Sequence, residues 1–192
     1  FKSLVKHHGT TYFEPIGRAL QAAGIKKPNP ANPAHAWALR KVLMPYGKWF
    51  LGEKMGGKPK PALPNMSPRL KEHAEFAATE LQRSPLEISG VMQKHQLKLA
   101  DRQCRMSELS ARIQNYVIIL CTSLYAARQD DEIIHAAADI LCQDLRRQLS
   151  GRRPSDRYFR AVTKLGQQLV DGGYKSISDV KSDEILMRYD AE

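Results

Sequence analysis

The sequence predicts an all-α fold, an antiparallel helical bundle preceded by an N-terminal basic amphipathic arm. Three observations lead to this expectation. Apolar residues recur every three or four positions over most of the chain, no apolar/polar alternation is long enough for a sheet, and capping residues, Pro and Gly mark off helix-length segments. With 192 residues, of which 42% are hydrophobic, the chain is long enough to form a core.

Two helical segments separated by a turn are expected in the N-terminal third. Residues 2–23 form the first candidate helix, although Pro15 lies within it. The segment 26–33 is rich in Pro and Asn, which is typical of a turn. Asn32 followed by Pro33 matches an N-cap followed by Pro at the first helical position, so a second helix is expected to begin there.

A proline-rich connector, residues 56–68, marks the main boundary of the chain because it carries four prolines. It separates a predicted arm, residues 1–66, from a predicted bundle domain, residues 67–173. Residues 174–192 lack a clear period and are expected to form a C-terminal tail.

Four helices are expected in the bundle domain, and short loops between them favour antiparallel neighbours. Their predicted ranges are about 68–100, 101–129, 131–149 and 156–170. Ser67 and Ser155 are the predicted N-caps of the first and last of these helices. The capping-box spacing from Ser84 to Glu87 also allows a break or kink near Pro85, and Gly172-Gly173 is expected to end the last helix.

The positive charge of the chain is concentrated in the arm. Residues 1–66 hold eleven Lys and Arg against two Glu, a net charge of +9, whereas residues 67–192 hold nineteen against eighteen, a net charge of +1. An even distribution would serve solubility equally well. The asymmetry therefore indicates a surface for an anionic partner within the arm.

Residues 36–55 combine basic and aromatic side chains, and on a helix they separate into two arcs. The apolar arc contains Leu39, Val42, Leu43, Tyr46, Trp49 and Phe50, and the basic arc contains Arg40, Lys41 and Lys48. This pattern is typical of an interfacial helix. The predicted membrane- or partner-docking residues are Trp37, Leu39, Arg40, Lys41, Leu43, Tyr46, Lys48, Trp49, Phe50 and Lys54.

Two further interpretations of this segment stay open. Its apolar arc could simply pack on its own domain, as the apolar faces of most helices do. Its charge could also serve a nucleic acid, although no helix-turn-helix, RNP or zinc motif accompanies it, and we therefore expect no nucleic-acid partner.

No catalytic, cofactor-binding or metal-binding residue is predicted in this chain. Residues 52–58 nearly match a P-loop, but Pro59 stands where the magnesium-binding Ser or Thr belongs, and no strand precedes the segment. His135 and Asp139 are spaced for a helical pair, which on a charged helix is more often solvated than metal-bound. The chain also lacks a run of about 18 apolar residues, so no membrane span is expected.

The cysteines indicate a reducing compartment. Cys104, Cys121 and Cys142 are odd in number and form no CxxC pair. Cys121 lies within an apolar run and is expected to be a small core residue rather than a nucleophile.

Helical motifs of small, aromatic and charged residues follow one another through the bundle domain. They are Ser67-Pro68-Arg69-Leu70, Lys94-His95, residues 106–113, 115–120 and 124–128, Tyr158-Phe159, Lys164-Leu165, Leu169-Val170 and Gly172-Gly173. In this order they resemble the C-terminal domain of the very-long-chain acyl-CoA dehydrogenases. The prolines at 45, 59, 61, 64 and 85 depart from the pattern of that family.

The resemblance implies a parent enzyme of fatty-acid β-oxidation. This enzyme would be an FAD-dependent dehydrogenase of long acyl-CoA thioesters that hands electrons to an electron-transfer flavoprotein. The FAD site and the glutamate base would lie in a dehydrogenase core upstream of Phe1, so this chain would be non-catalytic. None of Glu14, Glu53, Glu72 and Glu75 takes the place of that base.

The resemblance also implies a homodimer and an intracellular location on an anionic membrane surface. This surface would be the cytoplasmic face of a bacterial membrane or the matrix side of the mitochondrial inner membrane. Residues 33–60 occupy the position of the family's membrane-binding stretch. The alternative is a stand-alone helical adaptor or assembly factor, a role that a relative in this family fills, in which residues 36–55 would bind a protein partner.

Overall fold

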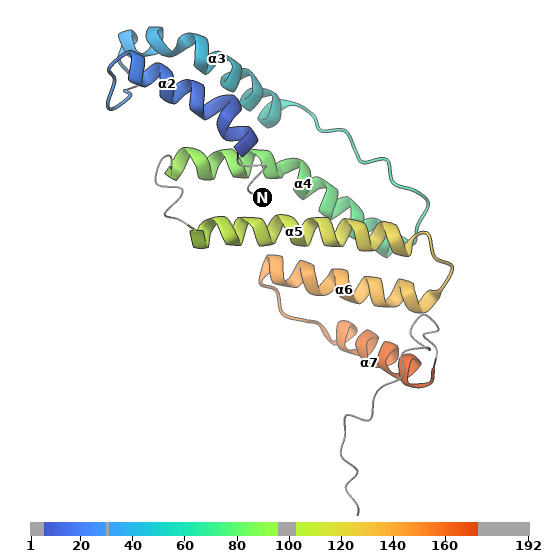
Figure 1. Cartoon of the computed structure of the whole chain (residues 1–192). Helices are drawn as coiled ribbons and strands as arrows, with labels where there is room; N and C mark the ends of the chain where they lie inside the picture. Colours follow the sequence, from blue (N-terminus) through green and yellow to red (C-terminus); the bar gives the residue numbers. More distant parts are fainter. Residues whose placement is uncertain (1–5, 30, 96–102, 173–192) are drawn as a thin grey trace, which may run out of the picture. The chain divides into compact units, whose positions relative to one another are not determined.

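The computed structural model describes residues 6–29, 31–95 and 103–172, and their regular structure is helical, with no strand among them (Figure 1). The all-α fold expected from the sequence is thereby confirmed. The elements are η1 (Gly9–Phe13), which is π-helical, α2 (Glu14–Ala22), α3 (Pro33–Met55), α4 (Pro68–His95), α5 (Gln103–Ala126), α6 (Glu132–Ser150) and α7 (Asp156–Val170). Residues 2–5, the helix ends expected at 100 and 101, Gly173 and the predicted tail 174–192 lie outside the described residues.

Side-chain caps begin several of the helices. Asn32 Oδ1 accepts the Ala34 N–H of α3 at 3.0 Å, and Ser155 Oγ accepts the Tyr158 N–H of α7 at 3.3 Å. Both N-caps were expected from the sequence, because a side-chain oxygen satisfies a backbone donor that has no partner within the helix. The helix break allowed near Pro85 does not occur, since α4 continues through this residue.

The chain divides into two compact units. Unit 1 consists of Phe1–Ala62 and Glu75–Ile118, and unit 2 consists of Leu63–Ala74 and Ile119–Glu192. Two of the three divisions fall within helices, in α4 after Ala74 and in α5 after Ile118.

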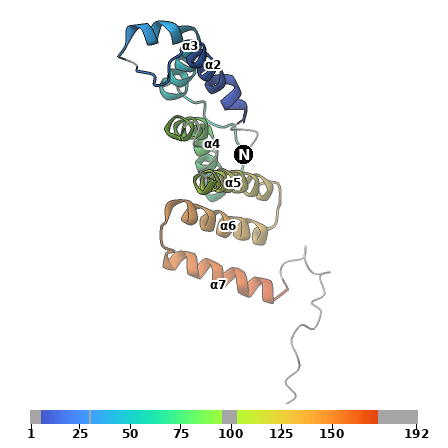
Figure 2. The same ribbon diagram turned by 60° about the vertical axis from the view of Figure 1, so that its left-hand side comes forward.

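Unit 1 contains residues 1–62 of the predicted arm together with most of α4 and α5. In it, η1 and α2 pack against α3, and Figures 1 and 2 show α2 and α3 side by side as a hairpin. Its buried core is made by Ile88, Val91, Met92 and Leu109, with Phe13 and Ile113 packed against them. An ion pair at 2.6 Å between Arg112 and Glu87 also joins α5 to α4.

Unit 2 contains α6 and α7, which run antiparallel (Figures 1 and 2). Leu70, Ala126 and Ala138 are its buried apolar cluster, with Met66 and Ile134 packed around it. No helix in the described part of the chain is long and apolar enough to cross a bilayer.

Candidate functional site

The apolar arc of α3 faces the interior of unit 1. Leu39 is only 5% exposed. Further along the same arc, the Trp49 ring lies 4.7 Å from His8 and 5.3 Å from Tyr12, measured between ring centroids. Tyr46 lies 5.8 Å from Phe13 in an edge-on arrangement. These spacings are typical of favourable aromatic pairs, so the segment before α3 supplies a packing partner for this arc.

Two hydrogen bonds hold the same arc to α4. The hydroxyl oxygen of Tyr46 lies 2.6 Å from the Oγ of Ser89, a fully buried side chain. The side-chain amide of Gln93 also donates to the Tyr46 hydroxyl. These hydrogen bonds hold the Tyr46 side of α3 against α4 inside unit 1. The opposite side of α3 is therefore turned towards the solvent.

The structure therefore separates the predicted docking residues into two groups. Leu39, Tyr46, Trp49 and Phe50 are buried or half-buried, and their rings and side chains pack within unit 1. The exposed residues are Trp37, Arg40, Lys41, Leu43, Lys48 and Lys54. Periodicity alone could not distinguish the two faces, because apolar residues occur on both sides of α3 and only one side has a partner.

A continuous outer face of α3 mixes exposed apolar and basic side chains. Its residues are Trp37, Arg40, Lys41, Met44, Lys48, Leu51 and Met55, which recur in steps of three and four. Trp37 is 68% exposed, Met44 59% and Met55 79%. Large apolar side chains exposed together in this way mark an interaction surface more often than a scattered few do.

Sequence reasoning missed Met44, Leu51 and Met55. The signal was present, because counting in helical steps from Trp37 reaches all three. The denser cluster of aromatic residues on the opposite arc favoured Tyr46 and Trp49 in the sequence-based prediction, and the structure packs these two rings inside unit 1.

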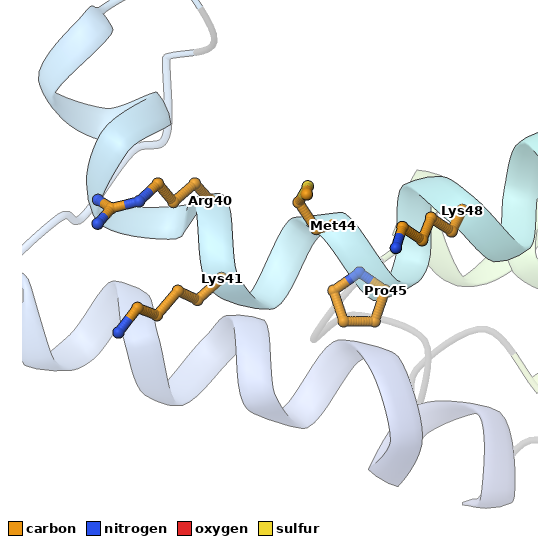
Figure 3. A pocket seen from close by; sticks show the side chains of 5 residues that line it. All are labelled: Arg40, Lys41, Met44, Pro45 and Lys48. Atoms are coloured by element: carbon orange, nitrogen blue, oxygen red, sulfur yellow. The ribbon is translucent and has the colours of Figure 1, made fainter.

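The centre of the outer face is hollowed. Arg40, Lys41, Met44, Pro45 and Lys48 line an open depression of about 530 Å³. Figure 3 shows Arg40 and Lys41 extending in the same direction from α3, with Met44 and Pro45 between them and Lys48. Three basic and two apolar side chains therefore line this depression together.

Charge on the outer face is uncompensated. Among the described residues, none of Arg40, Lys41 and Lys48 forms an ion pair with a carboxylate. The Arg40 guanidinium lies 3.5 Å from the centroid of the Trp37 ring and donates to the Trp37 carbonyl at 2.9 Å. This stacking holds a cation against the indole, a combination suited to the boundary between water and an apolar phase.

The near P-loop segment does not have P-loop geometry. A P-loop places its backbone amides at the beginning of a helix, where they bind phosphate. Here Gly52 lies in the last turns of α3, and Gly56 is its C-cap, with its N–H bonded to the Gly52 carbonyl. This end of a helix presents carbonyl oxygens, which repel anions.

Unit 2 holds a buried polar cluster centred on Asp139. Its carboxylate accepts from the Nε2 of His73 at 2.9 Å and from the Arg69 guanidinium at 3.0 Å. Burial raises the pKa of Asp139, but the hydrogen bonds from His73 and Arg69 and the charge of Arg69 outweigh it, so the pKa lies below its ordinary value. The Arg146 guanidinium lies 3.0 Å from His73 Nδ1, which must be the acceptor. All partners are satisfied, which is the arrangement of a structural network.

The remaining candidates for chemistry have ordinary structural roles. His135 Nε2 lies 2.9 Å from the Ala126 carbonyl oxygen rather than beside Asp139. Cys121 is exposed, so the expectation that it is a core residue is wrong, and Cys142 is the buried cysteine. Burial raises the pKa of the Cys142 thiol, which keeps it protonated and unreactive. Within residues 6–29, 31–95 and 103–172 no three His, Cys, Asp or Glu side chains are grouped to hold a metal ion.

Comparison with known proteins returned no matching family model, no matching curated protein and no matching solved structure. The resemblance to the very-long-chain acyl-CoA dehydrogenases is therefore carried by the quoted motifs alone.

Proposed function

We propose that this chain is a non-catalytic helical docking module that adsorbs to anionic membrane surfaces through the outer face of α3. The observation that supports it most is the combination of exposed Trp37, Met44, Leu51 and Met55 with three uncompensated cations on one face. A helix of this kind lies in the plane of the interface, with apolar side chains among the acyl chains and cations at the headgroups.

The magnitudes are adequate for reversible adsorption. A basic residue close to an anionic leaflet contributes about 1 kcal/mol, and the outer face presents Arg40, Lys41 and Lys48. Full burial of a Leu- or Met-sized side chain contributes at most about 1.5 to 3 kcal/mol, and partial insertion contributes less. Binding therefore needs both contributions, and we expect it to weaken as salt screens the charges.

A membrane explains this face better than the other two partners do. A nucleic acid would pair with the cations but would leave Met44, Leu51 and Met55 without a contact, since phosphate backbones offer no apolar surface. A protein groove that receives a helix usually takes a continuous apolar stripe, whereas here basic side chains interrupt the stripe at Arg40, Lys41 and Lys48.

Vesicle co-sedimentation tests the proposal. The full chain is expected to bind vesicles that contain phosphatidylserine and not vesicles of phosphatidylcholine alone, and Lys41→Glu with Lys48→Glu is expected to abolish binding. Lys71→Glu with Lys164→Glu is the matched control, because these exposed lysines lie off α3 and the change in charge is the same. If both double variants lost vesicle binding equally, net charge rather than the outer face would explain the effect. If the unmodified chain did not bind vesicles, the protein-partner alternative would be favoured.

The parent enzyme is a separate part of the proposal, and it rests on the resemblance. We propose that the chain belongs to a homodimeric, FAD-dependent dehydrogenase of long-chain acyl-CoA, with FAD and the electron-transfer flavoprotein contacting the dehydrogenase core. The coding sequence upstream of Phe1 tests this directly. A flavin-binding dehydrogenase core there supports it, and an unrelated sequence there overturns it.

A further inference from the structure

A second hollow lies in unit 1, where the chain that follows α3 runs along the middle of α4. Its volume is about 360 Å³, and its walls come from the end of α3, residues 56–61 and residues 79–86. The polar residues that line it are Glu53, Lys54, Lys58, Lys60, Thr79, Gln82 and Arg83. We call it the basic hollow.

Two reciprocal contacts fasten the wall of the basic hollow to α4. The Lys58 ammonium donates to the carbonyl oxygen of Gln82, and the side-chain amide of Gln82 donates to the Pro59 carbonyl at 3.1 Å. Pro59 and Pro61 restrict the backbone on either side of Lys60. At Gly56 a Cβ atom would collide with the carbonyl oxygen of Gly52, so this turn requires glycine. The hollow is therefore formed before any ligand arrives.

Positive charge exceeds negative charge in the basic hollow. Lys54, Lys58, Lys60 and Arg83 line it, against the single carboxylate of Glu53. Glu53 is already paired with Lys58. In the described part of the chain, Lys54 and Lys60 have no carboxylate partner, and Arg83 has a partner on only one side, Glu80 at 2.8 Å.

From this arrangement we propose that the basic hollow binds a phosphate monoester dianion through Lys54, Lys60 and Arg83. The planar guanidinium of Arg83 matches two phosphate oxygens, and the two ammonium groups act as point charges on the remaining one. A dianion fits better than a carboxylate, because Lys54 and Lys60 both lack a carboxylate partner in the described part of the chain and a single negative charge would compensate only one of them. The carbonyl oxygens at the end of α3 oppose an anion, and Lys54 in that last turn offsets them.

This inference does not depend on membrane adsorption through α3. None of Lys54, Lys60 and Arg83 belongs to the outer face, and none of the outer-face residues lines the basic hollow. The phosphate monoester could belong to a lipid headgroup or to a soluble molecule, since the three cations recognise the same group in either.

The binding test uses the full chain labelled with ¹⁵N and titrated with inositol 1,4,5-trisphosphate at constant ionic strength. The expected amide shifts are concentrated in residues 56–60 and 79–83, and Lys60→Gln with Arg83→Gln should weaken binding about tenfold or more. The matched control, Lys41→Gln with Lys48→Gln, should leave the affinity unchanged. Shifts spread over all basic segments, or equal weakening by both pairs, would overturn the proposal.

Two further arms separate the sources and guard against a folding defect. Vesicles with phosphatidylinositol 4,5-bisphosphate are compared with phosphatidylserine vesicles of equal charge. If Lys60→Gln with Arg83→Gln weakens binding only to the phosphatidylinositol 4,5-bisphosphate vesicles, the ligand is a lipid headgroup. If the same variant weakens binding only of the soluble inositol trisphosphate, the ligand is a soluble molecule. If that pair lowers the midpoint of thermal unfolding, Lys54→Gln replaces it, and unchanged affinity of this variant for both probes contradicts the site.

Discussion

Tyr46 and Ser89 are 43 residues apart in the chain, and their hydroxyl oxygens lie 2.6 Å from one another. Ser89 is fully buried, and the Tyr46 ring contacts Phe13 and Trp49. This bond turns the aromatic arc of α3 towards α4, and as a consequence Trp37 and Met44 face the solvent. The proposed docking face therefore depends on it.

Replacing Tyr46 by Phe should destabilise unit 1. The change removes the hydroxyl and leaves the buried Ser89 without this partner, a loss of about 1 to 3 kcal/mol in the free energy of unfolding. Urea denaturation measures it. Tyr125→Phe is the control, because Tyr125 is 60% exposed and its hydroxyl should contribute little. If Tyr46→Phe and Tyr125→Phe lowered the free energy of unfolding by the same amount, the Tyr46–Ser89 hydrogen bond would make no contribution of its own to stability.

Stability should also fall as the pH drops below 6.5. Burial lowers the pKa of His8 from its ordinary 6.5, and the neighbouring charge of His7 lowers it further. The buried Nε2 of His8 has no hydrogen-bond partner among the described residues. As the pH falls, His8 therefore takes up a proton at a higher pH in the unfolded chain than in the folded one. The contribution of neutral His8 to the free energy of unfolding is complete above pH 6.5 and is lost as the pH falls through the lower folded pKa.

The pH effect is measured by urea denaturation on both sides of pH 6.5. His8→Gln should flatten the dependence in that window, whereas the Asp139 network should act only at more acidic pH, because the pKa of Asp139 is lowered from 3.8. An unchanged slope in the His8 variant would show that His8 is not the group that titrates.

Removing the charge of Asp139 should disrupt unit 2. Asp139→Asn leaves the buried His73 and the Arg69 guanidinium without their carboxylate, at a cost of about 1 to 3 kcal/mol. Asp171→Asn is the matched control, since Asp171 is exposed at the C-cap of α7. Near-neutral pH is suitable, because the contribution of Asp139 is complete above 3.8 and is lost below it. Equal stability of the Asp139 and Asp171 variants would contradict the network.

Two glycine substitutions of the same chemistry should have opposite effects. Gly151 ends α6 with a φ of 66°, a conformation that is strained for alanine, so Gly151→Ala should cost about 1 kcal/mol. Gly166 lies inside α7 with open space where a Cβ atom would stand, so Gly166→Ala should stabilise by roughly 0.5 to 1 kcal/mol. Midpoints of thermal unfolding compare the two, and a shift of the same sign in both would refute this explanation.

Local sequence signals were sufficient for the helices and for several of their ends. Asn32 and Ser155 were predictable as N-caps because each accepts a hydrogen bond from a backbone N–H only two or three residues later, so no distant part of the chain is involved. The break allowed at Pro85 could not be decided locally. In the structure α4 continues through Pro85, and it is buried on both sides of this residue, at Ala77 before it and at Ile88 after it. Tertiary contacts outweigh the local preference there.

The candidate site was harder to predict, because it depends on which side of α3 finds a partner. Trp49 and Phe50 look like interfacial residues on a helical wheel. The structure packs Trp49 against His8 and Tyr12, and Phe50 against Tyr46. Cys121 shows the opposite case, a residue that was expected in the core and is exposed. An apolar run in the sequence does not specify which face of its helix is covered by other residues.

The most direct test of the docking face uses the two tryptophans of the chain. In Trp49→Phe only Trp37 remains, and in the matched control Trp37→Phe only Trp49 remains. Both variants are mixed with phosphatidylserine vesicles that contain brominated lipids, and tryptophan emission is recorded. The docking account predicts a blue shift and strong quenching for Trp37, with little change for Trp49. Quenching of Trp49 without quenching of Trp37 would contradict it and would return the interface to the aromatic arc.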